Sequence, residues 1–258
     1  MRTAVLLIAH GSERSRDCDS ATLHSGRIHA QTGYEVRVAY LYMNPGVAET
    51  VHGMMDDGIE RIIAVPLLFS PGHLAENTVR SKLGFAPGTD AGVIEYNGRK
   101  AEIVFTGTFG DHQKMRTVMV QTCDRYNAAP GKTSILLIFH SSGKKEAETN
   151  AEYLRERGYE VLAAYDGSGE PNVENALEKL AAGGHDILAV PMFVSPGIRT
   201  CVGIPGKLGI PNERGVAFPL KNGRSLIYGD EIGMHPDITY ILKDRISEAL
   251  RSEELLSF

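Results

Sequence analysis

"SPGHLAENTVRSKLG" at residues 70–84 recurs as "SPGIRTCVGIPGKLG" at residues 195–209, and this repetition decides the fold. The two stretches lie 125 residues apart, and "GYEV", "AVP" and "NGR" each recur at the same spacing. "LLIAH" at residues 6–10 also recurs, as "LLIFH" at residues 136–140. Ordered matches at one spacing indicate an internal duplication in which each copy is a structural unit. We therefore expect two domains of like fold, residues 1–128 and 132–258, joined through the turn-rich stretch "NAAPGKTS" at residues 127–134.

Each copy predicts strands that alternate with helices. Apolar runs bounded by glycine predict strands, and longer segments with helical punctuation predict helices. In the first copy we expect strands at 3–9, 34–42, 61–69 and 103–109, and helices at 20–32, 45–58 and 111–127. The closing helix of the second copy should start near Pro236 and run to about Glu254. Strand–helix alternation predicts the α/β class, with a doubly wound parallel sheet in each domain.

Composition excludes several classes of function. The 258 residues carry a net charge of −5, so no overall basic field favours a nucleic acid partner. The three cysteines, Cys18, Cys123 and Cys201, are far apart in the sequence and lack the CxxC spacing of zinc or iron–sulfur sites. Free thiols are typical of the reducing cytoplasm, where we expect the protein. The apolar run at residues 5–9 is too short for a membrane span or a signal peptide, so we expect no membrane partner.

Two histidines of the first copy follow predicted strands. His10 ends the first strand, and His73 follows the third strand after Ser70-Pro71-Gly72. In a parallel sheet both loops open at the same carboxyl edge, where ligands bind. Two imidazoles there can hold a divalent metal ion or accept protons near neutral pH; the alternative is that each is a hydrogen-bonded loop residue. The second copy keeps His140 but has Ile198 where the second histidine belongs.

The remaining histidines indicate structural roles. His24, His29 and His52 fall within predicted helices and are expected on the surface. His112 and His235 recur at the starts of the two closing helices, which favours a structural role for both. No GxGxxG, GxxxxGK[ST] or G-x-S-x-G pattern surrounds Gly11-Ser12, so neither a nucleotide site nor a serine nucleophile is predicted.

"LLIAHGS", "VPLLFSPGHLAENTV" and the closing G-x-H helix together resemble the CbiX-type class II tetrapyrrole chelatases over essentially the whole chain. The resemblance implies two tandem chelatase-like domains that insert a divalent metal ion into sirohydrochlorin, for cobalamin, sirohaem or a nickel tetrapyrrole. It also implies that His10 and His73 bind the incoming metal and take up pyrrole protons, the first copy being active and the second degenerate. The metal, Co²⁺ or else Ni²⁺ or Fe²⁺, is then a substrate, and no permanently bound cofactor is expected.

The resemblance also suggests which residues contact the tetrapyrrole. Because the tetrapyrrole is rich in carboxylates, hydrogen-bonding and basic groups should border the site. Tyrosine rings can stack on the macrocycle. The expected contacts are Ser12, Arg14, Tyr40, Tyr42, Glu76 and Arg199, with Arg80 as a further basic candidate. We expect a monomer or a weak homodimer.

The sequence departs from the family pattern at two points of the first copy. His73 directly follows Gly72 where the family has one residue between them, and no acid ends the second strand. These departures keep an alternative open, a non-catalytic paralogue that binds a tetrapyrrole or a metal.

Overall fold

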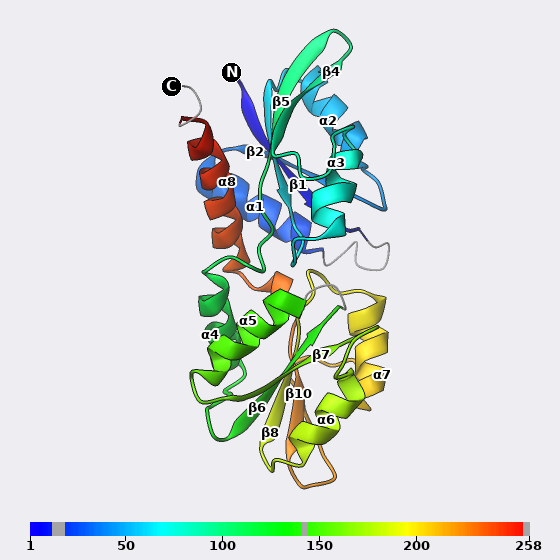
Figure 1. Ribbon diagram of the computed structural model, residues 1–258, viewed down its shortest axis with the longest axis vertical. Coiled ribbons are helices and arrows are strands. Elements are labelled where there is room, and N and C mark those ends of the chain that lie inside the picture. Colours follow the sequence, from blue (N-terminus) through cyan, green and yellow to red (C-terminus); the bar gives the residue numbers. More distant parts are fainter. Residues whose placement is uncertain (12–18, 141–143, 255–258) are drawn as a thin grey trace. The chain divides into compact units, whose positions relative to one another are not determined.

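The computed structural model describes residues 1–11, 19–140 and 144–254. The chain divides into two compact units: unit 1 joins Met1–His112 to the C-terminal segment from Pro236, and unit 2 is Gln113–His235. Within the described residues, each unit contains a five-stranded sheet flanked by helices (Figure 1). The α/β class and the duplication predicted from the sequence are confirmed.

The sheet of unit 1 has the strand order β2-β1-β3-β5-β4. Its strands are β1 (Thr3–Ala9), β2 (Glu35–Tyr40), β3 (Arg61–Pro66), β4 (Ala91–Tyr96) and β5 (Arg99–Phe105). β1, β2, β3 and β5 are parallel, and β4 runs antiparallel to β5. β1 and β3 are buried on both faces, which explains why their sequences are continuous apolar runs rather than alternating patterns.

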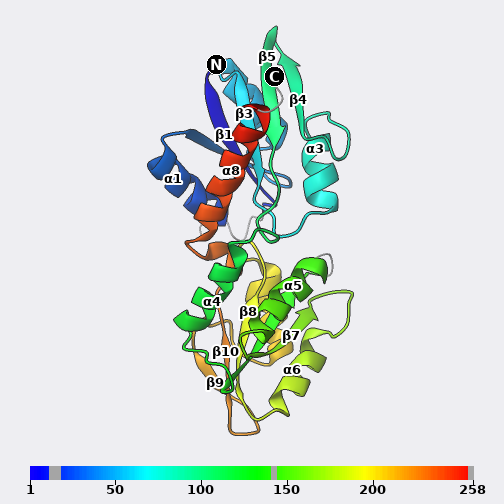
Figure 2. The same cartoon turned by 60° about the vertical axis from the view of Figure 1, so that its left-hand side comes forward.

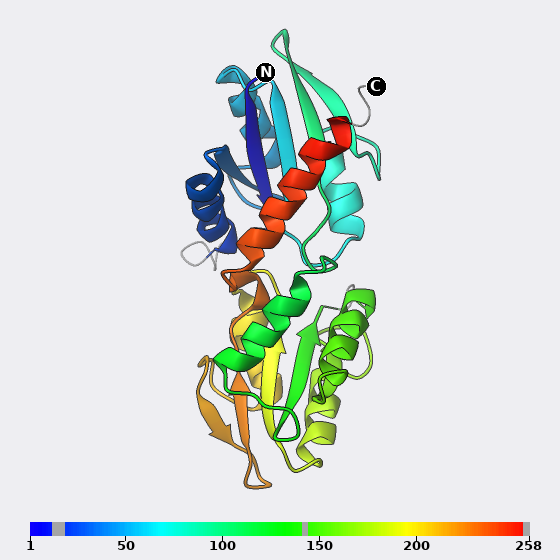
Figure 3. The ribbon, with the colours of Figure 1, turned by 90° about the vertical axis from the view of Figure 1, so that its left-hand side faces the viewer.

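Helices cover both faces of the unit 1 sheet. α2 (Val47–Asp56) and α3 (Val79–Ser81) pack on the face that carries Leu6 and Ile8. α1 (Ser20–Thr32) and α8 (Ile238–Glu254) lie side by side against the sheet (Figure 3). Figure 2 shows α1 and α3 on opposite sides of the unit 1 sheet. His24 of α1 is buried, not on the surface as expected, and its Nδ1 lies 2.8 Å from Oγ1 of Thr239 on α8.

Unit 2 repeats this topology, with the strand order β7-β6-β8-β10-β9. Its strands are β6 (Thr133–Phe139), β7 (Glu160–Tyr165), β8 (Asp186–Pro191), β9 (Ala217–Pro219) and β10 (Ser225–Tyr228). Its helices are α4 (Met115–Arg125), α5 (Lys144–Arg155), α6 (Val173–Ala181) and α7 (Ile204–Leu208), with a 3-10 turn at Ile232–Met234. Ile8 pairs with Pro66 in unit 1, and Ile138 pairs with Pro191 in unit 2, so the two copies share one register.

The closing helices are exchanged between the two copies, and this corrects the expected domain boundaries. α4 follows the first copy in sequence but packs against α5 in unit 2, and α8 follows the second copy but packs against α1 and β3 in unit 1. Both helices bury an apolar stripe with helical spacing. Since the two sheets are equivalent, such a stripe fits either one. The sequence pattern therefore identifies the helices without indicating which sheet each one covers.

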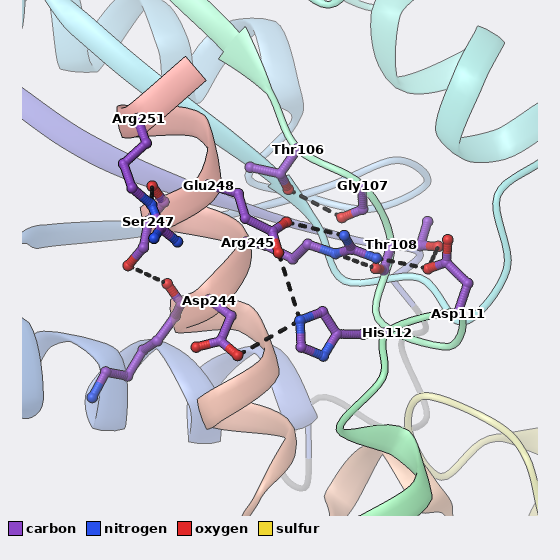
Figure 4. Close-up of polar contacts among 11 residues, drawn as sticks. Thr106, Gly107, Thr108, Asp111, His112, Asp244, Arg245, Ser247, Glu248 and Arg251 are labelled. Atoms are coloured by element: carbon purple, nitrogen blue, oxygen red, sulfur yellow. Dashed lines mark hydrogen bonds and ion pairs between the residues drawn. The ribbon is translucent and has the colours of Figure 1, made fainter. Parts of the chain in front are cut away.

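A cluster of charged and polar groups attaches α8 to the segment that follows β5 (Figure 4). Arg245 donates to the backbone oxygen of Thr108 at 2.9 Å and to the Asp111 carboxylate at 2.8 Å. Nε2 of His112 lies 3.6 and 3.7 Å from carboxylate oxygens of two α8 residues. We refer to the cluster as the α8 clasp, which consists of Thr108, Asp111, His112, Asp244, Arg245 and Glu248.

The segment held by the α8 clasp in turn supports the chain that leads to His73. The backbone N–H of Gly110 donates to the oxygen of Phe69 at 2.8 Å, and a Cβ at Gly110 would lie 2.2 Å from that oxygen. The rings of Phe69 and Phe109 meet edge to face, with centroids 5.5 Å apart. Only glycine can bring the backbone of residue 110 so close to the oxygen of Phe69. The loop after β3 is therefore held by the segment to which α8 is attached.

Candidate functional site

His10 lies directly beyond the carboxyl end of β1 and is exposed. Its Nδ1 is 3.0 Å from the backbone oxygen of Gly11, and its ring centroid is 4.7 Å from that of Tyr42, with the planes tilted by 50°. A carbonyl oxygen can only accept, so a neutral His10 carries its proton on Nδ1. Nε2 then keeps its lone pair, which is the form in which imidazole binds a metal ion.

Gly11 fixes the loop that carries His10. Its φ is +85°, and a Cβ at this position would lie 2.5 Å from Cγ of Met43 and 3.0 Å from Cβ of Tyr40. A side chain is therefore excluded by both backbone strain and the close approach of the loop after β2. Ser12 and Arg14, two expected substrate contacts, lie outside the described residues.

His73 begins a π-helical turn, His73–Thr78, that runs into α3. The ring is exposed, and the amide nitrogen of Asn77 lies 3.0 Å from its Nδ1. The backbone N–H of Glu76 closes the start of the turn on the oxygen of Gly72 at 2.8 Å. Unit 2 has a corresponding π-helical turn at Arg199–Gly203. Single π-helical turns occur frequently at functional sites.

β1 and β3 are adjacent parallel strands, and Ile8 pairs with Pro66 near their carboxyl ends. The loops of His10 and His73 therefore leave the same edge of the unit 1 sheet, as the sequence predicted. In the part of the chain that the structure describes, no group of three or more histidine, cysteine or carboxylate side chains is arranged to hold a metal ion. The candidate site rests on the two imidazoles.

Three other predicted contacts also lie near this edge. Tyr42 is 57% exposed beside His10, and Glu76 is exposed on the π-helical turn. Tyr40 is half-buried, and its hydroxyl donates to the Asp19 carboxylate at 2.5 Å. Tyr42 and Glu76 are therefore accessible to a ligand, whereas Tyr40 anchors the chain before α1.

Arg80 does not border the site as expected, because it is buried. Its Nε donates to the backbone oxygen of Thr89 at 2.7 Å, its Nη1 donates to the oxygen of Ala75, and its guanidinium lies 4.8 Å from the ring centroid of Phe105. Burial lowers the pKa of Arg80, and the negative charges of Asp90 and Glu76 offset part of this decrease. The side chain holds the π-helical turn against the core.

In unit 2, an ion-paired cluster lies at the corresponding edge. Asp166 follows β7 and is only 4% exposed, and its carboxylate accepts from Lys207 at 2.6 Å and from Arg199 at 3.1 Å. Burial opposes its ionisation, but these hydrogen bonds outweigh burial and lower the pKa of Asp166. Arg199, an expected substrate contact, is thus engaged with Asp166 although its side chain is 54% exposed. Sequence reasoning missed Asp166, which replaces the apolar Leu41 of the first copy.

No helix within the described residues is both long and apolar enough to span a membrane. The fold defines a class of α/β proteins made of two like units, each with a mostly parallel five-stranded sheet. The structure superposes on SirB from Bacillus subtilis, solved with Fe³⁺, with a TM-score of 0.75, 18% sequence identity and coverage of 98% of both chains. The chain belongs to the CbiX family, whose model matches residues 4–126 and again residues 135–249.

Two curated relatives match this chain in different ways. The probable sirohydrochlorin cobaltochelatase of Halobacterium salinarum is 24% identical over 95% of this chain and 91% of its own length. The sirohydrochlorin cobaltochelatase of Methanopyrus kandleri is 30% identical and covers 46% of this chain with 99% of its own length. The first relative thus resembles the whole duplicated chain, and the second resembles a single copy.

Proposed function

We propose that this protein inserts a divalent metal ion into a sirohydrochlorin-type tetrapyrrole, with Co²⁺ as the first candidate metal and Ni²⁺ or Fe²⁺ as alternatives. The observation that carries the proposal is the pair of exposed imidazoles, His10 and His73, at the ends of adjacent strands in unit 1. Membership of the CbiX family and the names of the relatives support the same reaction.

The reaction exchanges one divalent metal ion for two pyrrole N–H protons. The site must release the metal as the pyrrole nitrogens replace its protein ligands, and it must then accept protons. Neutral imidazoles serve both purposes, because they bind borderline metal ions weakly enough to exchange and protonate near neutral pH. Tyr42 offers an exposed aromatic face beside His10, where a flat macrocycle can stack.

Only one of the two units retains both histidines. In unit 2, His140 follows β6 as His10 follows β1, but Ile198 stands at the position of His73. The buried carboxylate of Asp166 is already occupied by two cationic side chains. We therefore assign metal insertion to unit 1, the unit that has both histidines.

The test is metal insertion into sirohydrochlorin, followed by absorption, with Co²⁺, Ni²⁺ and Fe²⁺ in turn. His10→Ala and His73→Ala should each abolish most of the insertion. His140→Ala is the matched control, a histidine at the equivalent strand end of unit 2, and should retain most of it. Equal losses in all three variants would show that both units handle metal.

The assay also separates an enzyme from a carrier. Tetrapyrrole binding, measured by fluorescence quenching, with no insertion above the uncatalysed rate for any of the three metals would identify a non-catalytic binding protein. The absence of an acid after β2, where Leu41 stands in place of the Asp166 of unit 2, is the observation that favours this second candidate.

A further inference from the structure

The two histidines of the candidate site are held by different kinds of hydrogen-bonding group. Nδ1 of His10 faces the backbone oxygen of Gly11 at 3.0 Å. Nδ1 of His73 faces the side-chain amide nitrogen of Asn77, also at 3.0 Å. A carbonyl oxygen only accepts hydrogen bonds, and an amide nitrogen only donates them. The same ring nitrogen must therefore be a donor in His10 and an acceptor in His73.

This difference fixes opposite tautomers in the two neutral rings. His10 carries its proton on Nδ1, so the lone pair of its Nε2 is exposed. His73 carries its proton on Nε2, and the lone pair of its Nδ1 accepts the hydrogen bond from the Asn77 amide. A metal ion binds only a nitrogen with a free lone pair. His10 is ready to take a metal ion, and His73 is not.

The turn that holds Asn77 is firmly fixed. Asn77 is four residues from His73 within the π-helical turn, whose backbone is held by the buried guanidinium of Arg80 through the oxygen of Ala75. The hydroxyl of Thr78 also donates to the backbone oxygen of His73 at 3.4 Å. Because the turn is anchored, the amide stays within reach of the ring, and what can change is its orientation about the last side-chain bond.

Unit 2 has neither residue of this pair. At the repeat spacing of 125 residues, His73 corresponds to Ile198 and Asn77 corresponds to Val202. Ile198 is 55% exposed and Val202 is 60% exposed, so neither apolar replacement is explained by burial in the core of unit 2. Every position from 73 to 81 differs between the two copies, so unit 2 lacks the histidine, its amide partner and the residues around them.

We propose that Asn77 is a positioning residue that sets the tautomer of His73 and makes the two histidines act in sequence. His10 takes the metal ion first, through Nε2. His73 joins after the Asn77 amide turns over, so that Oδ1 accepts from Nδ1–H. The ring proton moves from Nε2 to Nδ1 through solvent, with no net change in protonation, and frees the Nε2 lone pair. The tautomer follows from the geometry alone; its consequence for the metal rests on the proposed function.

The tautomers are tested on the metal-free protein by ¹⁵N NMR of the imidazoles, at a pH where the rings are neutral. We expect the proton on Nδ1 of His10 and on Nε2 of His73. Asn77→Asp should move the His73 proton to Nδ1, because a carboxylate only accepts, and Asn77→Leu should leave the tautomers mixed. Asn97→Asp is the matched control, with the same charge change at an exposed position in the turn between β4 and β5. A His73 proton on Nδ1 in the unmodified protein would overturn the proposal.

The metal consequence is tested with Co²⁺ alone. Asn77→Asp should bind Co²⁺ about tenfold more tightly than the unmodified protein, the lower end of the range for partners of metal-binding histidines, and Asn97→Asp should leave the affinity unchanged. Equal effects of the two substitutions would mean that added charge, not the tautomer, is responsible, and would refute the sequential order. If insertion into sirohydrochlorin failed while the NMR results held, the proposed function would be at fault and not the role of Asn77.

Discussion

Replacing Arg245 with methionine tests whether the α8 clasp holds the exchanged helix. The methionine keeps most of the apolar stem but removes the donor to the buried Thr108 carbonyl and the pairs with Asp111 and Glu248. An unsatisfied buried acceptor costs about 1–3 kcal/mol. The carboxylates of Asp111 and Glu248 are 47% and 46% exposed, so water solvates them once the arginine is removed. Loss of each ion pair therefore adds only roughly 0–1 kcal/mol to the destabilisation. Together these contributions mean that unit 1 should lose about 1–5 kcal/mol of stability and that its melting temperature should fall by roughly 4–20 °C.

The assay is differential scanning calorimetry together with hydrogen exchange of α8 peptides followed by mass spectrometry. Arg251→Met is the matched control, because this arginine is exposed on the same helix and its Nε donates to the Ser247 oxygen at 3.2 Å. Arg245→Met should speed exchange in α8, and Arg251→Met should not. Equal melting shifts for the two variants, or unchanged protection of α8, would refute the role assigned to the clasp.

Three further outcomes follow from buried or strained positions. Gly11→Ala places a Cβ 2.5 Å from Met43 Cγ at a φ of +85° and should cost about 1–3 kcal/mol in urea unfolding; an unchanged midpoint would contradict this. The pKa of Asp166 is lowered, so its stabilisation is complete above the ordinary value of about 3.9 and is lost as pH falls through the lowered pKa. The stability gap between the unmodified protein and Asp166→Asn should therefore narrow in thermal melts below that pH, and a constant gap would refute the assignment. Burial raises the pKa of the Cys123 thiol to about 11, so iodoacetamide at pH 8 should label the partly exposed Cys201 but not Cys123 in the native protein, as read by peptide mass spectrometry.

The repeat and the apolar runs predicted four strands of unit 1 and most of its helices, but β5 lies four residues earlier than the strand expected at 103–109, and β4 was not among the predicted strands. The strand expected at residues 3–9 and the helix expected at residues 20–32 have those bounds in the structure. Glycine punctuation and buried parallel strands are local signals, and both sheets follow them. The assignment of α4 and α8 could not be predicted, because two equivalent sheets accept the same apolar stripe. His24 was misjudged for the same reason, since it is covered by α8 from the distant end of the chain.

The candidate site was predictable where it depends on strand ends. His10 and His73 follow adjacent strands, and topology alone brings their loops to one edge. Side-chain partners were less predictable, because they depend on packing between segments far apart in sequence. Arg80 became a buried anchor through Thr89 and Phe105, and Arg199 became engaged with Asp166.

The exchange of closing helices has a consequence for how the protein is made. A ribosome delivers the strands of unit 1 first, but it delivers α8 only after all of Gln113–His235 has been synthesised. At 5–20 residues per second, the sheet surface that α8 covers waits roughly 6–25 s for its last helix. During that interval it presents apolar side chains that chaperones bind. Unit 2 is contiguous and can finish while unit 1 is still open, so the usual N-to-C order of co-translational folding is inverted in this chain.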